Sequence, residues 1–294
     1  MSFNPAISPD GSRVAFVSQA TDLVSLTDGN QQTDVYLRDI NANSTFAISW
    51  NSTGTAMGNA GSSTPIFSAD GENVLFISIA TDLASGDSNG KQDIFLWNRV
   101  SQTNELISVN AAGNGTGSGA SGLTAACVSD SLRYVAFFSD APDLVAGNAD
   151  SNGVSDVFVR DRVDGVTRLI SFNPDSDVLG NGASFSPFVS AAGDVIVFAT
   201  DASNLGTNDL NSATDIVATA LTNDVPASMT LSAMIFLPRE IPQGVEFPIT
   251  IEVANFGSAT IANLRVAHLG SAMLSRVGLQ TTQGNIDPAG ERGG

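Results

Sequence analysis

The sequence predicts an all-β chain built from four tandem units of about 60 residues, each with four short strands. Three observations lead to this prediction: a composition poor in helix-forming residues, a loop motif repeated at near-equal spacing, and short apolar runs around each copy. The 294 residues contain 24 Asp but only 6 Glu and a single Lys, together with 28 Gly. Asp and Gly favour turns, whereas Glu and Lys favour helices. We therefore expect many strands joined by many loops.

The repeated loop has the pattern Asp-x-Asn-x-x-x-Asp and stands directly before an apolar strand. Its copies begin at positions 28, 87, 150 and 209, so they lie 59, 63 and 59 residues apart. Self-similarity at a fixed spacing indicates a repeat architecture. The motif residues are Asp28, Asn30, Asp34, Asp87, Asn89, Asp93, Asp150, Asn152, Asp156, Asp209, Asn211 and Asp215.

Each unit opens with a short strand that ends in a tight turn, at residues 6–11 in the first unit and 66–71 in the second. The third and fourth units keep only part of this turn. A second strand follows as an unbroken apolar run, which is typical of a strand buried on both faces. These runs are Val14–Val17, Val74–Ile77, Val135–Phe138 and Ile196–Ala199.

The third strand of each unit follows the last Asp of the loop. A fourth strand is predicted in three units, whereas the fourth unit shows no clear one. The third strands are Val35–Arg38, Ile94–Trp97, Val157–Arg160 and Ile216–Thr219, and the fourth strands are Phe46–Ser49, Leu106–Ser108 and Leu169–Ser171. The expected units span residues 1–50, 51–109, 110–172 and 173–222, with boundaries placed approximately.

Four short strands per unit, at a fixed period and without helices, indicate the blades of a β-propeller. The Ser-x-Asp-Gly turns at Ser8–Gly11 and Ser68–Gly71, each followed by an apolar strand, resemble the TolB-type, WD-like propeller repeats of bacterial exported proteins. The resemblance covers residues 1–222. The Ala-Thr-Asp-Leu segments at residues 20–23 and 80–83 suggest a subgroup of surface proteins. The sequence leaves open whether four blades close by themselves, form an open arc or belong to a larger ring.

Residues 223–227 are predicted to be a linker, and residues 228–294 a separate module. Apolar residues alternate with others over 229–235 and 247–253, which indicates half-buried antiparallel strands. The segment 253–266 resembles the small immunoglobulin-like repeats of bacterial surface proteins, of the CARDB type. Such a sandwich needs about seven strands and about 100 residues. We therefore expect an incomplete module, either truncated or completed by a strand from a partner.

The Asp/Asn loops are candidate calcium sites, because calcium takes about 6–8 oxygen ligands from carboxylates, amide carbonyls, backbone and water. Gly90 and Gly153 would allow the sharp turn of such a loop. The first loop has Gln31 and the fourth Ser212 at this point, so calcium is expected less strongly there. The alternative is that these loops are turns only, since Asp, Asn and Gly are the usual turn residues. The corner residues Asp22, Asp82 and Asp143 would then cap the preceding turn rather than add ligands.

The charge and the reactive residues narrow the possible functions. The formal net charge is −18, with a pI of about 4.1, which argues against nucleic acid and anionic membranes as partners. No apolar run has the length of a membrane span, so no membrane insertion is expected. The only histidine, His268, lies away from any Ser or Cys motif, and no Gly-x-Ser-x-Gly elbow is present. Cys127 is the single cysteine and is expected to be a small core residue.

We therefore expect a non-enzymatic binding or assembly scaffold, stabilised by calcium, in an extracellular, cell-surface or periplasmic location. Repeat sequence follows Met1 directly, without a signal peptide, so we expect a piece of a longer exported precursor. Its partner would be a protein, a surface polysaccharide or other copies of itself. One alternative is the accessory propeller of a secreted hydrolase or polysaccharide-degrading enzyme. Another is a filament or surface-layer subunit assembled by β-strand donation.

Overall fold

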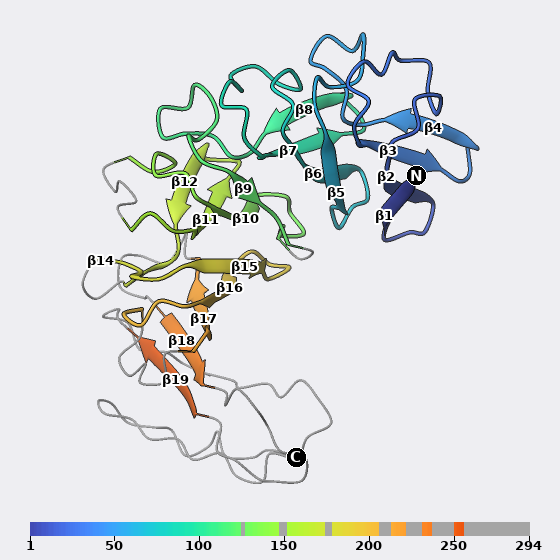
Figure 1. Cartoon of the computed structure of the whole chain (residues 1–294). Coiled ribbons are helices and arrows are strands. Elements are labelled where there is room, and N and C mark those ends of the chain that lie inside the picture. The colour runs from blue at the N-terminus through green and yellow to red at the C-terminus, as the bar shows by residue number, and fades with distance from the viewer. Residues whose placement is uncertain are drawn as a thin grey trace, which may run out of the picture.

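The computed structural model describes residues 1–124, 127–146, 152–173, 178–205 and 213–221, and the backbone of residues 231–236 and 250–255. The described residues are all-β, as predicted, and their sheets are antiparallel. Figure 1 shows the sheets following one another along an open arc, with the N-terminal sheet at one end and the C-terminal strands at the other. The part of the chain that the structure describes holds no helix with the length and apolar character of a membrane span.

The first two sheets each contain four antiparallel strands in chain order. This up-and-down order is that of a propeller blade, so the predicted blade architecture is confirmed for these units. The first sheet is β1 (Ser2–Ile7), β2 (Arg13–Ser18), β3 (Asp34–Asp39) and β4 (Ser44–Ala47). The second is β5 (Ser62–Phe67), β6 (Asn73–Ser78), β7 (Asp93–Asn98) and β8 (Thr103–Leu106).

The next two sheets repeat this plan with local changes. The third is β9 (Ser121–Gly122), β10 (Tyr134–Ser139), β11 (Asp156–Asp161) and β12 (Val166–Leu169). A small hairpin follows, formed by β13 (Phe172–Asn173) and β14 (Val178–Leu179). The fourth sheet has five strands: β15 (Ser184–Val189), β16 (Val195–Thr200), β17 (Asp215–Ala220), β18 (Leu231–Phe236) and β19 (Thr250–Asn255).

The fourth sheet corrects the expectation that the fourth unit lacks a fourth strand. β18 pairs with β17 from Ile216–Ile235 to Thr219–Ser232, and β19 pairs with β18. Both strands lie in the alternating segments predicted to be antiparallel strands, and they extend the fourth sheet. The spacing hides this role, because β4 follows β3 after a short turn whereas β18 begins well beyond the end of β17. The predicted linker, and the rest of the immunoglobulin-like module with His268, lie outside the described residues.

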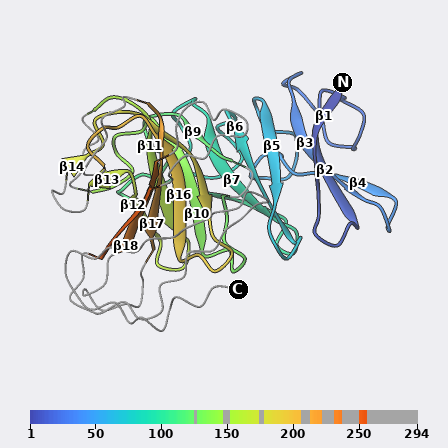
Figure 2. The ribbon, with the colours of Figure 1, turned by 90° about the horizontal axis from the view of Figure 1, so that it is seen from below.

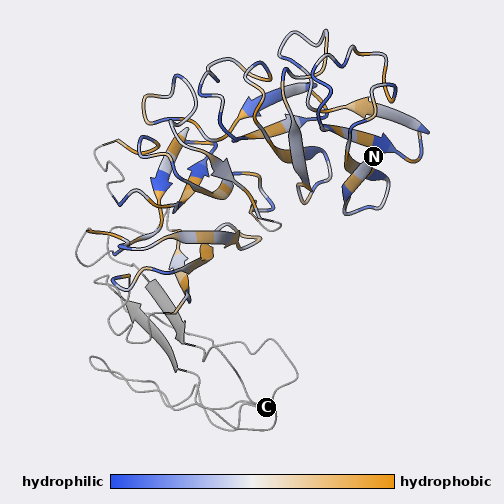
Figure 3. Cartoon of the chain, viewed as in Figure 1, coloured by the Kyte–Doolittle hydropathy of each residue, from blue (hydrophilic) through white to orange (hydrophobic). Residues whose placement is uncertain are grey.

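The apolar core lies between successive sheets, which Figure 2 shows side by side along the arc. Ala15, Val35 and Leu37 on one face of the first sheet pack against Phe76 and Phe95 of the second. The second and third sheets, and the third and fourth, meet through equivalent clusters. The central strands of the two middle sheets are apolar on both faces because each of these sheets has a neighbour on either side. Figure 3 shows the hydrophobic residues gathered on the strands.

Repeated hydroxyl pairs join the first strand of all four sheets to the second strand. In the first sheet, Ser2 Oγ donates to Ser18 Oγ at 2.9 Å. The Oγ atoms of Ser62 and Ser78 lie 2.8 Å apart, those of Ser121 and Ser139 lie 2.9 Å apart, and Ser184 Oγ lies 2.9 Å from Thr200 Oγ1. Ser78 Oγ also accepts the backbone N–H of Ala80 at 3.0 Å. This fixes the corner where the chain leaves the second strand and enters the Asp/Asn loop.

Candidate metal sites at the blade corners

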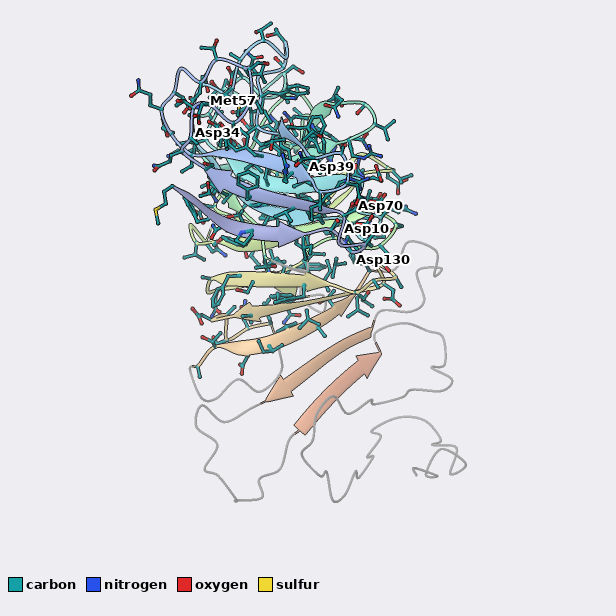
Figure 4. The ribbon with its side chains drawn as sticks, turned by 90° about the vertical axis from the view of Figure 1, so that its right-hand side faces the viewer. Asp10, Asp34, Asp39, Met57, Asp70 and Asp130 are labelled. Atoms are coloured by element: carbon teal, nitrogen blue, oxygen red, sulfur yellow. The ribbon has the colours of Figure 1, made fainter. Side chains whose placement is uncertain are left out.

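Each Asp/Asn loop connects the second and third strands of a sheet, as the sequence predicts. Its last Asp is the first residue of β3, β7, β11 or β17. Figure 4 shows Asp34 at one end of the sheets and the turn residues Asp10, Asp70 and Asp130 at the opposite end. The first two loops are described completely, whereas Asp150, Asp209 and Asn211 lie outside the described residues.

The last Asp of each loop is buried and, in three units, is bonded to a serine at the end of the fourth strand. Asp34 Oδ1 accepts a hydrogen bond from Ser49 Oγ at 2.9 Å, and Asp93 Oδ1 accepts one from Ser108 Oγ at 2.7 Å. Asp156 Oδ1 accepts one from Ser171 Oγ at 2.6 Å.

Each of these serines also accepts the backbone N–H of the residue that follows the Asp. The N–H of Ile94, for example, lies 3.1 Å from Ser108 Oγ. The same contact joins Val35 to Ser49 at 2.9 Å and Val157 to Ser171 at 3.0 Å. We call each set of Asp, Ser and backbone N–H a corner relay. It ties the start of the third strand to the end of the fourth, so the loop leaves a rigid point.

The middle Asn holds the loop to the segment that leads into the next unit. Asn30, Asn89 and Asn152 donate from Nδ2 to the carbonyl oxygens of Gly58, Gly117 and Gly180, at 2.6, 2.7 and 2.8 Å. Their Oδ1 atoms accept a backbone N–H two residues further on, which forms an Asx-turn. The Asn side chain is therefore used by the fold, and a cation would share its Oδ1 atom with the Asx-turn.

The residue after the Asn needs a left-handed backbone in all three loops where it is described. Gly90 and Gly153 have φ values of 61° and 69°, as the sequence predicts, and Gln31 has the same conformation with a φ of 55°. A left-handed conformation costs a residue with a Cβ roughly 1–2 kcal/mol. The first loop therefore makes the same turn as the others at a local cost.

The first Asp of the loop has carboxylate oxygens that no hydrogen bond uses. Asp28 Oδ1 accepts the backbone N–H groups of Asn30 and Gln31 at 3.1 and 3.2 Å, but Asp28 Oδ2 is buried without a partner. Both oxygens of Asp87 are buried without a partner. The same is true of Asp34 Oδ2 and Asp93 Oδ2 in the corner relays. Buried polar atoms are nearly always satisfied by a protein group, water or an ion, and these oxygens are the places in the corner where water or a cation would bind.

The protonation of these groups reflects their burial. Burial raises the pKa of Asp34 and of Asp93 to about 7. The serine hydrogen bonds and the nearby side-chain amides of Asn30 and Asn89 oppose this rise, whereas the charges of Asp28 and Asp87 add to it. Burial also raises the pKa of Asp87; the nearby backbone N–H of Asn89 opposes this rise, and the charge of Asp82 adds to it. A carboxyl group with such a pKa binds a proton near neutral pH unless a cation compensates its charge.

These loops fit a cation in part. Among the described residues, no three His, Cys, Asp or Glu side chains come together as a ligand set. The first two loops each provide two carboxylates with unused oxygens: Asp28 with Asp34, and Asp87 with Asp93. Calcium would take the rest of its ligands from backbone carbonyls and water. Within the predicted Asp/Asn/Asp ligand set, the two carboxylates are the groups that hold unused oxygens.

Other corner residues have structural partners. Asp82 Oδ1 accepts the backbone N–H of Asn59 at 2.9 Å, and Asp143 Oδ1 accepts that of Ser118 at 2.8 Å. Both contacts hold the segment between units, which favours the turn interpretation over a role as ligands. Cys127 is buried in the core, as predicted, and burial raises the pKa of its thiol to about 12.

A groove of about 570 Å³ lies beside the second sheet. Its lining combines an indole ring with amide, hydroxyl and carboxylate groups from the inter-unit turn and from β8. Its lining includes Trp50, Asn51, Thr53, Gln102, Asn104 and Glu105. Asn104 donates to the carbonyl oxygens of Ile48 and Trp50 at 3.2 Å, and its Oδ1 atom is buried without a partner.

The serines of the corner relay are the residues that sequence reasoning missed. Each stands 15 residues after its Asp, at the end of an Ile-Ser pair. That constant interval is a signal in the sequence, but Ser is common throughout the chain. The pairing becomes visible only when the third and fourth strands lie side by side.

The arrangement of the sheets is similar to that of several solved structures. No protein-family model and no curated protein matches the chain. Among solved structures, it is similar to a putative TolB from Agrobacterium tumefaciens, with 16% identity, a TM-score of 0.40, and coverage of 75% of this chain and 61% of that one. It is also similar to the tricorn protease, with 11% identity, a TM-score of 0.42, and coverage of 84% and 26%. An oligogalacturonate lyase in complex with manganese gives 8% identity, a TM-score of 0.42, and coverage of 78% and 60%.

The chain thus spans less than two thirds of the length of each of these structures. At these identities the similarity describes a β-propeller-like arrangement alone.

Proposed function

We propose that the chain is a non-enzymatic binding or assembly scaffold of an extracellular, cell-surface or periplasmic protein, and that calcium stabilises its first two blade corners. The observation that carries the proposal is a pair of carboxylates with buried oxygen atoms at the same point of both units. Asp28 with Asp34, and Asp87 with Asp93, hold oxygen atoms that no hydrogen bond uses.

Physical chemistry favours an occupant at these corners. A buried carboxylate without compensation costs several kcal/mol, and a second negative charge nearby adds to this cost. A divalent cation between the two carboxylates removes both penalties. With few protein ligands, its Kd belongs in the weak range of extracellular calcium modules, about 10⁻⁴–10⁻³ M. This range suits a protein outside the cytoplasm.

The test is the thermal unfolding of the full chain at pH 8, after chelator treatment, with EDTA or with about 5 mM calcium. At about ten times Kd, bound calcium adds about 1.4 kcal/mol per site to the free energy of unfolding, so Tm rises. Asp87→Asn removes one carboxylate of the second pair and should reduce this rise. Asp130→Asn, at the exposed turn on the opposite end of the sheets, is the matched control. An equal Tm with and without calcium would contradict a stabilising role for calcium.

The groove beside Trp50 favours a surface polysaccharide as one partner. Its volume lies within the range of about 300–1,000 Å³ typical of ligand sites. An indole ring offers an apolar face for a sugar ring, and the amide oxygen of Gln102 offers a hydrogen-bond acceptor for a hydroxyl group. Affinity electrophoresis in gels containing neutral or acidic polysaccharides tests this. Retardation that Trp50→Ala abolishes supports the proposal, and unchanged migration in every gel contradicts it.

A further inference from the structure

At each end of the arc, one face of the terminal sheet has no neighbouring sheet among the described residues, whereas the equivalent faces of the other sheets are buried in the interfaces between units. Each internal interface joins the forward face of one sheet, which points to the next unit, to the backward face of the following sheet. The forward faces of the first two sheets are aliphatic, with residues such as Val35 and Leu37. The backward faces of the second and third sheets carry the stacked pairs Phe76–Phe95 and Phe137–Phe158. The third interface varies this pattern, with Tyr134 on the forward face and Phe198 on the backward face, but all three join apolar residues of one forward face to one backward face.

The forward face of the fourth sheet has the same chemistry but no neighbour among the described residues. Val35, Ile94 and Val157 directly follow the last Asp of their loops and are 0% exposed, whereas the equivalent Ile216 is 36% exposed. Phe188 pairs with Val197 on this face and is 46% exposed.

The backward face of the first sheet is also left open in part. Phe76 and Phe137 are 0% exposed, whereas the equivalent Phe16 is only half-buried and stacks on Tyr36. Ile7 pairs with Val14 on the same face and is 65% exposed. Three apolar residues of the first Asp/Asn loop cover part of this face by packing beside Tyr36: Leu23, Val24 and Leu26.

We infer that these two faces bind each other between copies of the chain. The forward face of the fourth sheet of one copy packs on the backward face of the first sheet of another. The inference rests on continuity with an existing interface, because the two open faces are the two halves of the contact that the chain makes internally. The contact is heterologous, so it closes into a ring or continues as an open array. Two copies would bring eight sheets together, within the range of about 4–8 blades found in propellers.

The charge of the chain makes this association depend on salt. The net charge of −18 opposes contact between copies, while the faces themselves are apolar. Added salt screens the repulsion and leaves the hydrophobic contact in place. Association should therefore strengthen with salt, which is opposite to the behaviour of an interface held by ion pairs.

The experiment is sedimentation velocity of the full chain up to about 100 µM, at low and high salt, which reaches weak interfaces. The wild type should sediment as two or more chains. Ile216→Asp on the forward face and Ile7→Asp on the backward face should each sediment as one chain. Val100→Asp, at an exposed turn off both faces, should behave as wild type. Far-UV circular dichroism and Tm check folding, and Phe188→Ser replaces Ile216→Asp if that variant unfolds.

A mixture of the two single-face variants identifies the type of contact. Each still has one intact face, complementary to that of the other, so an equimolar mixture should form species of two chains and nothing larger. Three outcomes would overturn the inference: a wild type of one-chain mass under all conditions, association that only the forward-face variant disturbs, and a mixture that stays at one-chain mass. The second outcome would indicate a symmetric contact, and the first would show that the two open faces do not bind each other.

Discussion

Replacing Ser108 by Ala perturbs the corner relay at its centre. Ser108 is fully buried, donates to Asp93 Oδ1 at 2.7 Å and accepts the N–H of Ile94 at 3.1 Å. The alanine variant loses both hydrogen bonds while the fold around the methyl group is kept. It leaves Asp93 with two unsatisfied carboxylate oxygens and Ile94 with an unpaired buried N–H group.

The expected loss follows from these contacts. An orphaned buried polar group costs about 1–3 kcal/mol, and a hydrogen bond to a charged group contributes about 1.5–3 kcal/mol. We expect Ser108→Ala to lower the free energy of unfolding by about 2–4 kcal/mol at pH 8. In a chain of this size, about 1 kcal/mol corresponds to a change in Tm of about 2–4 °C. The Tm should therefore fall by about 4–16 °C.

The pH dependence of the loss separates this mechanism from simple repacking. Burial raises the pKa of Asp93 to about 7, and the Ser108 hydrogen bond opposes the rise. In the folded variant the carboxyl therefore keeps its proton to a higher pH than in the wild type. At pH 5 the carboxyl is protonated in both folded proteins, so the lost charge-assisted bond matters less there. The difference in Tm should be larger at pH 8 than at pH 5.

The assay is thermal unfolding followed by circular dichroism at the two pH values. Ser49→Ala and Ser171→Ala make the same change in the other two relays and serve as replicates within one chain. Ser88→Ala, at an exposed position of the second loop, is the control. The reasoning is refuted if all three relay variants stay within about 0.5 kcal/mol of the wild type, the range of ordinary surface substitutions. A larger loss at pH 5 than at pH 8 would refute it as well.

Three further predictions follow from the same corners. Gln31→Gly should raise the free energy of unfolding by up to about 1 kcal/mol in urea titrations, because Gln31 holds a φ of 55°; Gln31→Ala, which keeps a Cβ, should give no such gain. The chelated wild type should have a lower Tm at pH 8 than at pH 5. The folded-state pKa of Asp34 and of Asp93, about 7, lies above the ordinary value, so the folded state keeps these protons to a higher pH than the unfolded state and loses stability as they dissociate. A Tm that rises over this range contradicts this. Asn89→Ala should lower the free energy of unfolding by about 2 kcal/mol, because the hydrogen bond to the Gly117 carbonyl is lost. Hydrogen exchange at Gly117 and its neighbours should become faster, and unchanged exchange there would show that the bond does not hold the segment.

Much of the architecture could be predicted from the sequence because it depends on local patterns. The unbroken apolar runs gave the buried second strands, and the last Asp of each motif marked the start of the third strand. The degenerate turn of the third unit was also visible. Leu132 there has a φ of 58°, in the left-handed region that Gly11 and Gly71 also occupy in the first two units. Each of these features is decided within a few neighbouring residues.

The features that the sequence did not reveal depend on contacts between distant segments. The Asn side chains were expected to bind an ion, but their Nδ2 groups find carbonyl oxygens 28 residues further along the chain. The serines act across the hairpin of the third and fourth strands. β18 was placed in another module because the interval before it breaks the spacing of the earlier units. In each case the partner is fixed by the stacking of the sheets, which a single sequence does not display.

The two criteria for calcium, a glycine at the sharp turn and unused carboxylate oxygens, select different loops. Glycine at the sharp turn selects the loops of Asp87 and Asp150, whereas unused carboxylate oxygens are found in the loops of Asp28 and Asp87. In the third loop, Asp156 Oδ1 accepts from Ser171 and Asp156 Oδ2 accepts from Asn152 at 3.0 Å, so a cation would have to displace a hydrogen bond. Of the two loops that the structure describes completely, the second meets both criteria. If calcium stabilises the chain, most of the effect should therefore depend on Asp87, and a calcium response that survives Asp87→Asn unchanged would assign the ion to another corner.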